Sequence, residues 1–435
     1  MGVVCFDKKE RKPSIFTKGI IYIECIYNIK DYQETQIIND RGENHVNEEI
    51  QLKIKILNDG KIEDLFYKKC FTKLGYNTIY FIIEEKLNNM SYLFNNCSSL
   101  KEINFFIQET IQVNKMREMF QNCESLEYID LTNFNISNVT DTGFMLNGCK
   151  KLKYISGINN YNKLKVKNMC AMFQNCEELE NLYLTNCNTS KVKDMRRMFY
   201  GCKKLEEIKG IDNFNTINVT NMNAMFQGCN KLKSLDLSNF DTSNVKDMNN
   251  MFNDCIKLKE IIGINYFNTI NVTKMNSMFE NCCEIFNLDL SNFDTSNVSD
   301  MSNMFRECIK LKEIKGINNF NTMNVKNMSG LFDGCNQLKS LNLKNFNTAN
   351  VNDMSLMLNK CYKLKTIKGI NNFNTVNAIN MKGMFQLCKE LDYLNLKNFN
   401  TYNVKTMVGI FCGCNKIKEI KGIHNLNITN VIDIF

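Results

Sequence analysis

The chain has 435 residues, 44% of them hydrophobic, and its 54 basic and 46 acidic residues give a formal net charge of +8. This length is large for one globular core, and so mild a charge gives little support to nucleic acid as a partner. With two histidines and no visible nucleophile–base pair, phosphate loop or carboxylate constellation, the sequence predicts no enzyme and no cofactor.

Residues 1–19 form an N-terminal tail with one targeting feature. Gly2 is a candidate for myristoylation and Cys5 for palmitoylation, and a basic cluster follows them. Phe6 stands where the myristoylation motif has Ser or Thr, so an ordinary solvated tail is the alternative. No apolar run is long enough to span a membrane. We therefore expect a cytoplasmic protein, peripheral to the membrane only through such lipidation, with the cell surface as the alternative.

Residues 20–87 are rich in β-forming apolar runs, at 20–27, 52–57 and 78–83, with a turn at 58–61. They predict a small β domain. Because a repeat array needs a cap over its apolar end, we expect this domain to cover the repeats that follow.

Residues 88–435 are a repeat array. Thirteen cysteines recur with gaps of 26 or 27 residues, at positions 97, 123, 149, 176, 202, 229, 255, 282, 308, 335, 361, 388 and 414. Such a period indicates about 13 stacked coils, each one supersecondary unit that buries its apolar face only against its neighbours. Function is therefore expected on a surface.

One coil shows the pattern. Leu232, Leu235 and Leu237 predict a short strand, because residues two apart share a face. From Val245 to Cys255 the apolar residues fall at offsets 0, 3, 6, 7 and 10, which predicts a short amphipathic helix. Strands are accordingly predicted at Leu126–Leu131, Leu179–Leu184, Leu232–Leu237, Ile285–Leu290, Leu338–Leu343 and Leu391–Leu396.

Every second coil carries one extra residue beside a glycine, at Gly157, Gly210, Gly263, Gly316, Gly369 and Gly422. Glycine at an insertion indicates a bulge or a close approach of two backbones. The repeat is thus a pair of coils, 53 residues long.

The segments Leu235–Val245 and Met248–Cys255 closely resemble the BspA-type leucine-rich repeat family, in its Met-x-x-Met-Phe-x-x-Cys variant. The resemblance covers about residues 88–435. It implies an α/β repeat, a right-handed leucine-rich-repeat solenoid with a parallel sheet on one face and short helices on the other, and a role in binding or adhesion. It implies no catalytic residues. The chain departs from the pattern at 104–107, at Thr142 and Gly143, and at Cys187, so the early coils are expected to be less regular.

The 24 methionines mostly fall four and seven residues before the repeat cysteines, and we interpret them as core packing rather than a thioether copper site. The cysteine column is predicted to be free, buried thiols. Disulfide bonds between successive coils remain the alternative, because the spacing of neighbouring strands is close to the distance that a disulfide spans. No metal site is expected, since the close pairs Cys282–Cys283 and Cys412–Cys414 lack zinc-ligand spacing.

The predicted binding surface is the set of outward strand positions between the core leucines. We expect Asp289 to lie beside Lys315 and Lys209 beside Asp236, which would give rows of mixed charge with few aromatics. The candidates are Glu207, Lys209, Ser234, Asp236, Asn287, Asp289, Glu313, Lys315, Asn342, Lys368, Asn395, Glu419 and Lys421. The alternative interpretation is that these charges only keep the sheet soluble.

Three functions remain open. The leading hypothesis is a non-enzymatic scaffold that binds protein partners through the sheet face. The alternatives are a cell-surface adhesin of the BspA type and a structural rod that assembles end to end through the C-terminal coil.

Overall fold

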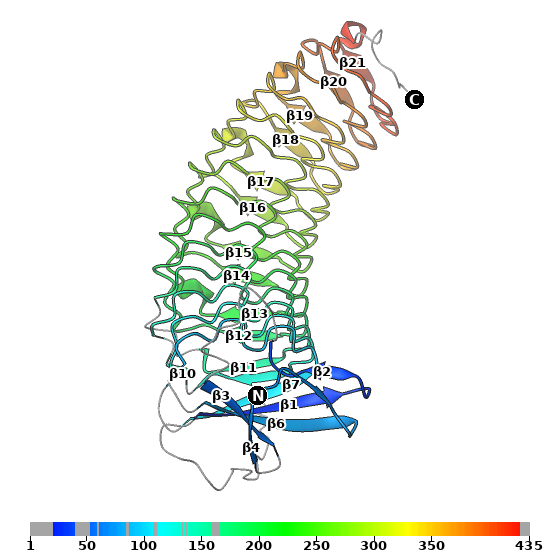
Figure 1. The fold of residues 1–435 in the computed structure, drawn as a ribbon. Coiled ribbons are helices and arrows are strands. Elements are labelled where there is room, and N and C mark those ends of the chain that lie inside the picture. Colours follow the sequence, from blue (N-terminus) through cyan, green and yellow to red (C-terminus); the bar gives the residue numbers. More distant parts are fainter. Residues whose placement is uncertain are drawn as a thin grey trace.

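A computed structural model describes residues 21–39, 53–58, 61–83, 87–107, 111–132, 134–135, 137–158 and 165–426. The chain winds into stacked coils that form one elongated, curved solenoid, with the N-terminal strands at one end and β20 and β21 at the other (Figure 1). Each coil of the solenoid contributes one short strand to the same side of the molecule.

The strands of the solenoid are short. Between residues 165 and 426 each has three residues, whereas the first coil has an eight-residue strand. They are β7 (Leu100–Ile107), β8 (Ile111–Gln112), β9 (Tyr128–Asp130), β10 (Phe134–Asn135), β11 (Tyr154–Ser156), β12 (Asn181–Tyr183), β13 (Glu207–Lys209), β14 (Ser234–Asp236), β15 (Glu260–Ile262), β16 (Asn287–Asp289), β17 (Glu313–Lys315), β18 (Ser340–Asn342), β19 (Thr366–Lys368), β20 (Tyr393–Asn395) and β21 (Glu419–Lys421).

The prediction of an α/β repeat with helices on the opposite face is wrong: the molecule is a β-solenoid. Within the described part of the repeat array there is no α-helix. The helical elements there are single 3₁₀ turns that follow the inserted glycines, namely η2 (Ile211–Asn213), η3 (Ile264–Tyr266), η4 (Ile317–Asn319), η5 (Ile370–Asn372) and η6 (Ile423–Asn425). The segment predicted as a helix is instead a succession of tight turns, which we call the turn face.

Two left-handed residues in each coil account for the missing helix. In one coil Asn250 has φ 57° and Asp254 has φ 59°, and equivalent pairs recur along the array. A residue in this conformation cannot continue a right-handed helix. Some backbone N–H groups then bond three residues back, as from Met225 to the Met222 carbonyl at 3.2 Å. Others bond the next coil, as from Phe226 to the Met251 carbonyl at 2.9 Å.

The apolar stripe nevertheless faces the core as predicted. Val245, Met248, Met251, Phe252 and Cys255 are all fully buried. The phenylalanines stack from coil to coil, with Phe252 lying 5.7 Å from Phe226 and 5.6 Å from Phe279 between ring centroids. The methionines are therefore core residues.

The cysteine column is buried and hydrogen-bonded. Each column thiol from Cys123 to Cys414 donates to a backbone carbonyl of the preceding coil, as Cys229 does to Phe199 at 3.2 Å. Every cysteine among the described residues is a free thiol. Burial raises the pKa of Cys202 to about 12. The predicted burial is confirmed except at Cys414, which is partly exposed.

Polar residues also form columns that tie one coil to the next. Thr242 is buried, and its hydroxyl donates to the Asn268 carbonyl at 2.9 Å. Asn244 is exposed, and its amide donates to the Ile217 carbonyl at 2.8 Å. Equivalent bonds recur in the following coils, so the Thr-x-Asn-Val sequence of the repeat is a structural element of the stack.

The glycines of the longer coils explain the 53-residue unit. Gly263 has φ 83°, and a Cβ there would lie 2.4 Å from the Ser238 Cα of the preceding coil. The predicted close backbone approach is confirmed. Beyond these glycines the chain turns into a 3₁₀ helix. As a result, β14 pairs with β15 and β16 with β17 in separate two-stranded parallel sheets, rather than in one continuous sheet.

The N-terminal strands join the first coils. They are β1 (Ile21–Ile29), β2 (Glu34–Gln36), β3 (Ile54–Asn58), β4 (Lys61–Asp64), β5 (Lys68–Cys70) and β6 (Gly75–Ile83). A seven-stranded sheet runs in the order β11-β9-β7-β1-β6-β3-β4, and β1 is antiparallel to both β7 and β6. Because β7 pairs with the long strand β1, it is longer than the later coil strands. Asn104, where β7 departs from the repeat pattern, donates a hydrogen bond from its side-chain amide to the Glu24 carboxylate at 2.9 Å.

A comparison at Leu356, which has φ 54°, tests the left-handed turns. We expect Leu356→Gly to be more stable than Leu356→Ala by about 1 kcal/mol, because glycine adopts this conformation without steric cost. In a helix alanine would be the more stable by a similar amount. Chemical denaturation of the two variants measures the difference, and a more stable alanine variant would contradict the turn.

The close approach at Gly263 gives a second prediction. Gly263→Ala should lower the free energy of unfolding by about 2–3 kcal/mol, from backbone strain together with the clash against Ser238. Gly228 is the matched control, since it also has a positive φ, but a Cβ there would meet its nearest atom, of Gly201, at 3.4 Å. Gly228→Ala should therefore cost only about 1 kcal/mol. Equal losses in the two variants would show that the coils do not approach closely at Gly263.

Candidate functional site

The strands β12–β21 present one side of the solenoid to solvent, which we call the strand face. In each three-residue strand the central residue points inward, as Leu235 does at 2% exposure. The first and third residues point outward, because side chains alternate along a strand. Parallel pairing then sets these outward residues beside those of the neighbouring coil.

All thirteen predicted surface residues lie at such outward positions of β13, β14 and β16–β21. Asp236, Asp289 and Asn395 are half-buried and the other ten are exposed. The positions are thus as predicted, while their role in binding stays a prediction.

One of the two predicted charge contacts forms. Asp289 is in register with Lys315, and the ammonium lies 2.7 Å from the carboxylate. That hydrogen bond, with one from Ser291, lowers the pKa of Asp289. Lys209 instead lies 3.7 Å from Glu207 and over the ring of Tyr183, while Asp236 is in register with Ile262. The prediction failed there because β13 and β14 belong to different two-stranded sheets.

A second row of ion pairs borders the strand face. Lys233 reaches Glu206 at 2.8 Å and Lys310 reaches Glu284 at 2.7 Å, each across one coil boundary. Both lysines are thus paired with the preceding coil. Over its central part the face therefore carries several charges that are paired across a coil boundary.

The strand face also holds exposed apolar side chains that were not predicted from the sequence. Tyr183, Ile262 and Tyr393 are outward strand residues, 46%, 44% and 45% exposed, and Phe286 just before β16 is 40% exposed. The ammonium groups of Lys310 and Lys312 lie over the Phe286 ring. The exposure of Tyr183, Ile262 and Tyr393 could have been predicted, because they stand at the outward strand positions of the repeat. Exposed aromatic side chains beside charges are typical of protein-binding surfaces.

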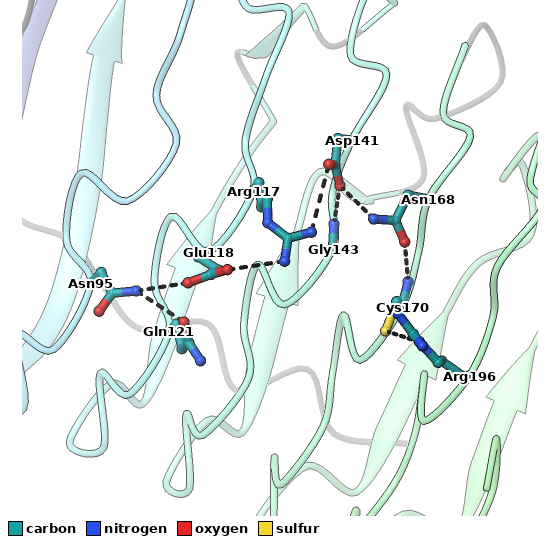
Figure 2. A network of polar contacts seen from close by, with 9 residues as sticks. All are labelled: Asn95, Arg117, Glu118, Gln121, Asp141, Gly143, Asn168, Cys170 and Arg196. Atoms are coloured by element: carbon teal, nitrogen blue, oxygen red, sulfur yellow. Dashed lines mark hydrogen bonds and ion pairs between the residues drawn. The ribbon is translucent and has the colours of Figure 1, made fainter. Parts of the chain in front are cut away.

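The turn face of the early coils carries a polar network (Figure 2). Arg117 pairs with Glu118 at 3.2 Å and with Asp141 at 3.7 Å. Asp141 also accepts hydrogen bonds from the Gly143 N–H at 2.8 Å and from the Asn168 amide at 3.1 Å. The ion pair between Arg117 and Asp141 and the hydrogen bond from Asn168 each cross a coil boundary, so the network joins these irregular coils.

Gly143 is the departure from the repeat that makes room for this network. A Cβ there would lie 3.0 Å from the Arg117 guanidinium and 2.9 Å from the Asn168 amide. At its far end, Arg196 donates to the Cys170 sulfur at 3.1 Å, and burial raises the pKa of that thiol. The early coils are irregular, as predicted: Thr142 is buried where the neighbouring coils have a buried methionine, and Gly143 leaves room for these contacts.

Gly2 and Cys5 lie outside the described residues. Among the residues that are described, no three His, Cys, Asp or Glu side chains gather closely enough to hold a metal ion. No helix in that part of the chain is long and apolar enough to cross a membrane.

The chain matches one protein family over most of its length. The family is described as "Mycoplasma protein of unknown function, DUF285", and it matches residues 68–181, 178–281, 203–313, 259–367 and 332–435. No curated protein matches the sequence. Among solved structures, the Toll–Spatzle complex, described as a molecular hub in Drosophila development and innate immunity, is 13% identical with a TM-score of 0.27. The alignment covers 68% of this chain and 38% of that one.

Proposed function

The chain belongs to the DUF285 family, and we propose that it is a non-enzymatic scaffold that binds protein partners through the strand face of its β-solenoid. The family description names no activity, so the proposal rests on the surface itself. The observation that carries it is the regular placement of exposed charged, polar and aromatic side chains along one side of the stack.

The strand face is held rigidly and is long enough for a protein interface. Outward side chains are held by strands whose central residues are buried, so binding would cost little additional ordering of the backbone. The coils repeat at about 4.8 Å, so ten strands extend the face over roughly 45 Å, enough for a standard protein interface. The turn face, in contrast, uses its polar groups to join neighbouring coils.

A charge-swap variant tests the proposal. Lys209→Glu, Asp236→Lys, Asp289→Lys and Lys315→Glu together keep the net charge and retain the possibility of an ion pair between positions 289 and 315. We expect capture of protein partners from the native cell, quantified by mass spectrometry, to fall by about tenfold or more, because surface charge complementarity sets partner choice.

The control swaps an ion pair on the turn face. Glu307→Lys with Lys360→Glu exchanges two groups that lie 3.7 Å apart. This variant should capture the same partners as the unmodified chain. If the strand-face variant folds normally and still captures every partner, these four positions on β13–β17 do not bind the partners.

An adhesin is the second candidate function, favoured by the resemblance of Leu235–Val245 and Met248–Cys255 to BspA-type repeats. It would use the same strand face, so the two functions differ in compartment. Surface proteolysis of intact cells distinguishes them: cleavage of the chain from outside supports the adhesin, and full protection supports the scaffold.

A further inference from the structure

Charge is unevenly distributed along the solenoid. Residues 336–426 contain 13 lysines, no arginine and four acidic residues, Asp353, Glu390, Asp392 and Glu419. This excess of nine positive charges is larger than the net charge of the whole chain, +8, so the remainder is slightly acidic. The basic excess therefore belongs to the last coils, around β18–β21 (Figure 1).

The strand register shows how the excess arises. In β16 and β17, Asp289 lies opposite Lys315 and neutralises it at 2.7 Å. In β18 and β19 the equivalent residues are Asn342 and Lys368, and in β20 and β21 they are Asn395 and Lys421. The aspartate has become asparagine in both later pairs. The lysine remains, and it has lost its ion-pair partner.

Neighbouring positions add to the effect. Lys344 takes the place held by Ser291 two coils earlier, and it is exposed. Lys365 stacks on Lys339, with its backbone N–H donating to the Lys339 carbonyl at 2.9 Å. Among the described residues, none of six exposed lysines on this end of the strand face makes an ion pair. We call them the basic patch: Lys339, Lys344, Lys365, Lys368, Lys418 and Lys421.

We infer that the basic patch binds an acidic polypeptide segment, which lies across β18–β21. This inference rests on the proposed function, because it names the chemistry of a partner of the strand face. Lys368 and Lys421 are two coils apart, about 10 Å. Their flexible side chains can therefore reach successive carboxylates along an extended chain. The exposed ring of Tyr393 lies between their coils and supplies an apolar contact.

The composition of the patch favours carboxylates over phosphodiesters. Asp392 and Glu419 are exposed within it and would repel a phosphate backbone, which is charged at every unit, whereas a polypeptide can place neutral residues opposite them. Single-strand nucleic-acid sites also present several aromatic platforms and arginines, whereas Tyr393 is the single exposed aromatic residue of β18–β21. A membrane surface would call for apolar side chains to enter the interface, and these strands present lysine and asparagine.

Fluorescence anisotropy tests the inference with a labelled peptide of alternating glutamate and serine. The patch variant carries Lys344→Gln, Lys365→Gln, Lys368→Gln and Lys421→Gln. We expect it to bind about tenfold or more weakly than the unmodified chain, since several favourable charge contacts are removed. The control variant removes the same charge from exposed lysines away from the strand face, at Lys246, Lys326, Lys382 and Lys405, and should change affinity by less than about twofold.

Three outcomes would overturn the inference. Equal losses in both variants would mean that only net charge matters. Tighter binding of oligothymidine, or of phosphatidylserine vesicles, than of the peptide at equal salt would assign the patch to nucleic acid or membrane. The third is no binding of the peptide at low salt.

Capture of native partners by the two variants distinguishes a failure of this inference from a failure of the proposed function. If the charge swap at 209, 236, 289 and 315 abolishes partner capture and the patch variant does not, the strand face binds proteins but not through the basic patch. If neither variant affects capture, the proposed function itself fails.

Discussion

Raising the pH from about 7.5 to about 9.5 should unfold the solenoid, because thiols with a pKa of about 8.5 ionise in the unfolded chain and not in the folded one. The column cysteines Cys123–Cys388 are fully buried, and burial raises the pKa of each, that of Cys202 to about 12. Their contribution to stability is therefore complete below the unfolded pKa and is lost as the pH rises above it.

The expected loss of stability is large because the free-energy contributions of the individual thiols add. One pH unit above its unfolded pKa, each buried thiol costs about 1.4 kcal/mol of stability. Summed over the column this exceeds about 10 kcal/mol, the size of the stability of an ordinary domain. Denaturant titrations at several pH values measure the slope. Cys229→Ala with Cys255→Ala should reduce it, and Cys70→Ala, at an exposed thiol, should leave it unchanged. A stability that does not change with pH would contradict a column of buried, reduced thiols.

Phe252→Ala should lower the free energy of unfolding by about 3–5 kcal/mol, since it empties a fully packed site. The Phe252 ring is stacked between Phe226 and Phe279, so its loss weakens the contacts of its coil with both neighbours. In a linear array each coil is stabilised mainly by its neighbours, so the two flanks should then unfold in separate transitions.

Calorimetry of the variant measures both effects. Phe286→Ala is the control, because that ring is 40% exposed on the strand face, and its removal should change stability by less than about 1 kcal/mol. A single transition at the unmodified midpoint for Phe252→Ala would show that the phenylalanine stack does not hold the coils together.

The sequence predicted which residues are buried better than it predicted their backbone. The offsets of Val245, Met248 and Cys255 fit a helix, but successive tight turns return side chains to one side with similar spacing. The available signal was the residue before most of the repeat cysteines, such as Gly228, Asp254 and Asn281 in three successive coils. Glycine, aspartate and asparagine are the residues that most readily adopt a left-handed conformation.

The candidate surface was predictable within a coil and between the two coils of β16 and β17, but not between β13 and β14. Alternation along a strand placed Asp289 and Lys315 outward, and parallel register then brought them together. The contact between Lys209 and Asp236 could not be excluded from the sequence, because it depended on whether β13 and β14 pair. Beyond the inserted Gly210 the chain forms η2, which packs against β14, and no ladder joins β13 to β14. This arrangement is a property of the stacked coils.

Site-specific photo-crosslinking tests the central claim, that the strand face binds protein partners, most directly. A benzophenone amino acid replaces Tyr183 or Tyr393 on the strand face, and Arg197 or Lys382 on the turn face, in the full chain expressed in its native cell. All four positions are exposed. We predict protein adducts from positions 183 and 393 and none from 197 and 382; adducts confined to the turn-face positions would contradict the account.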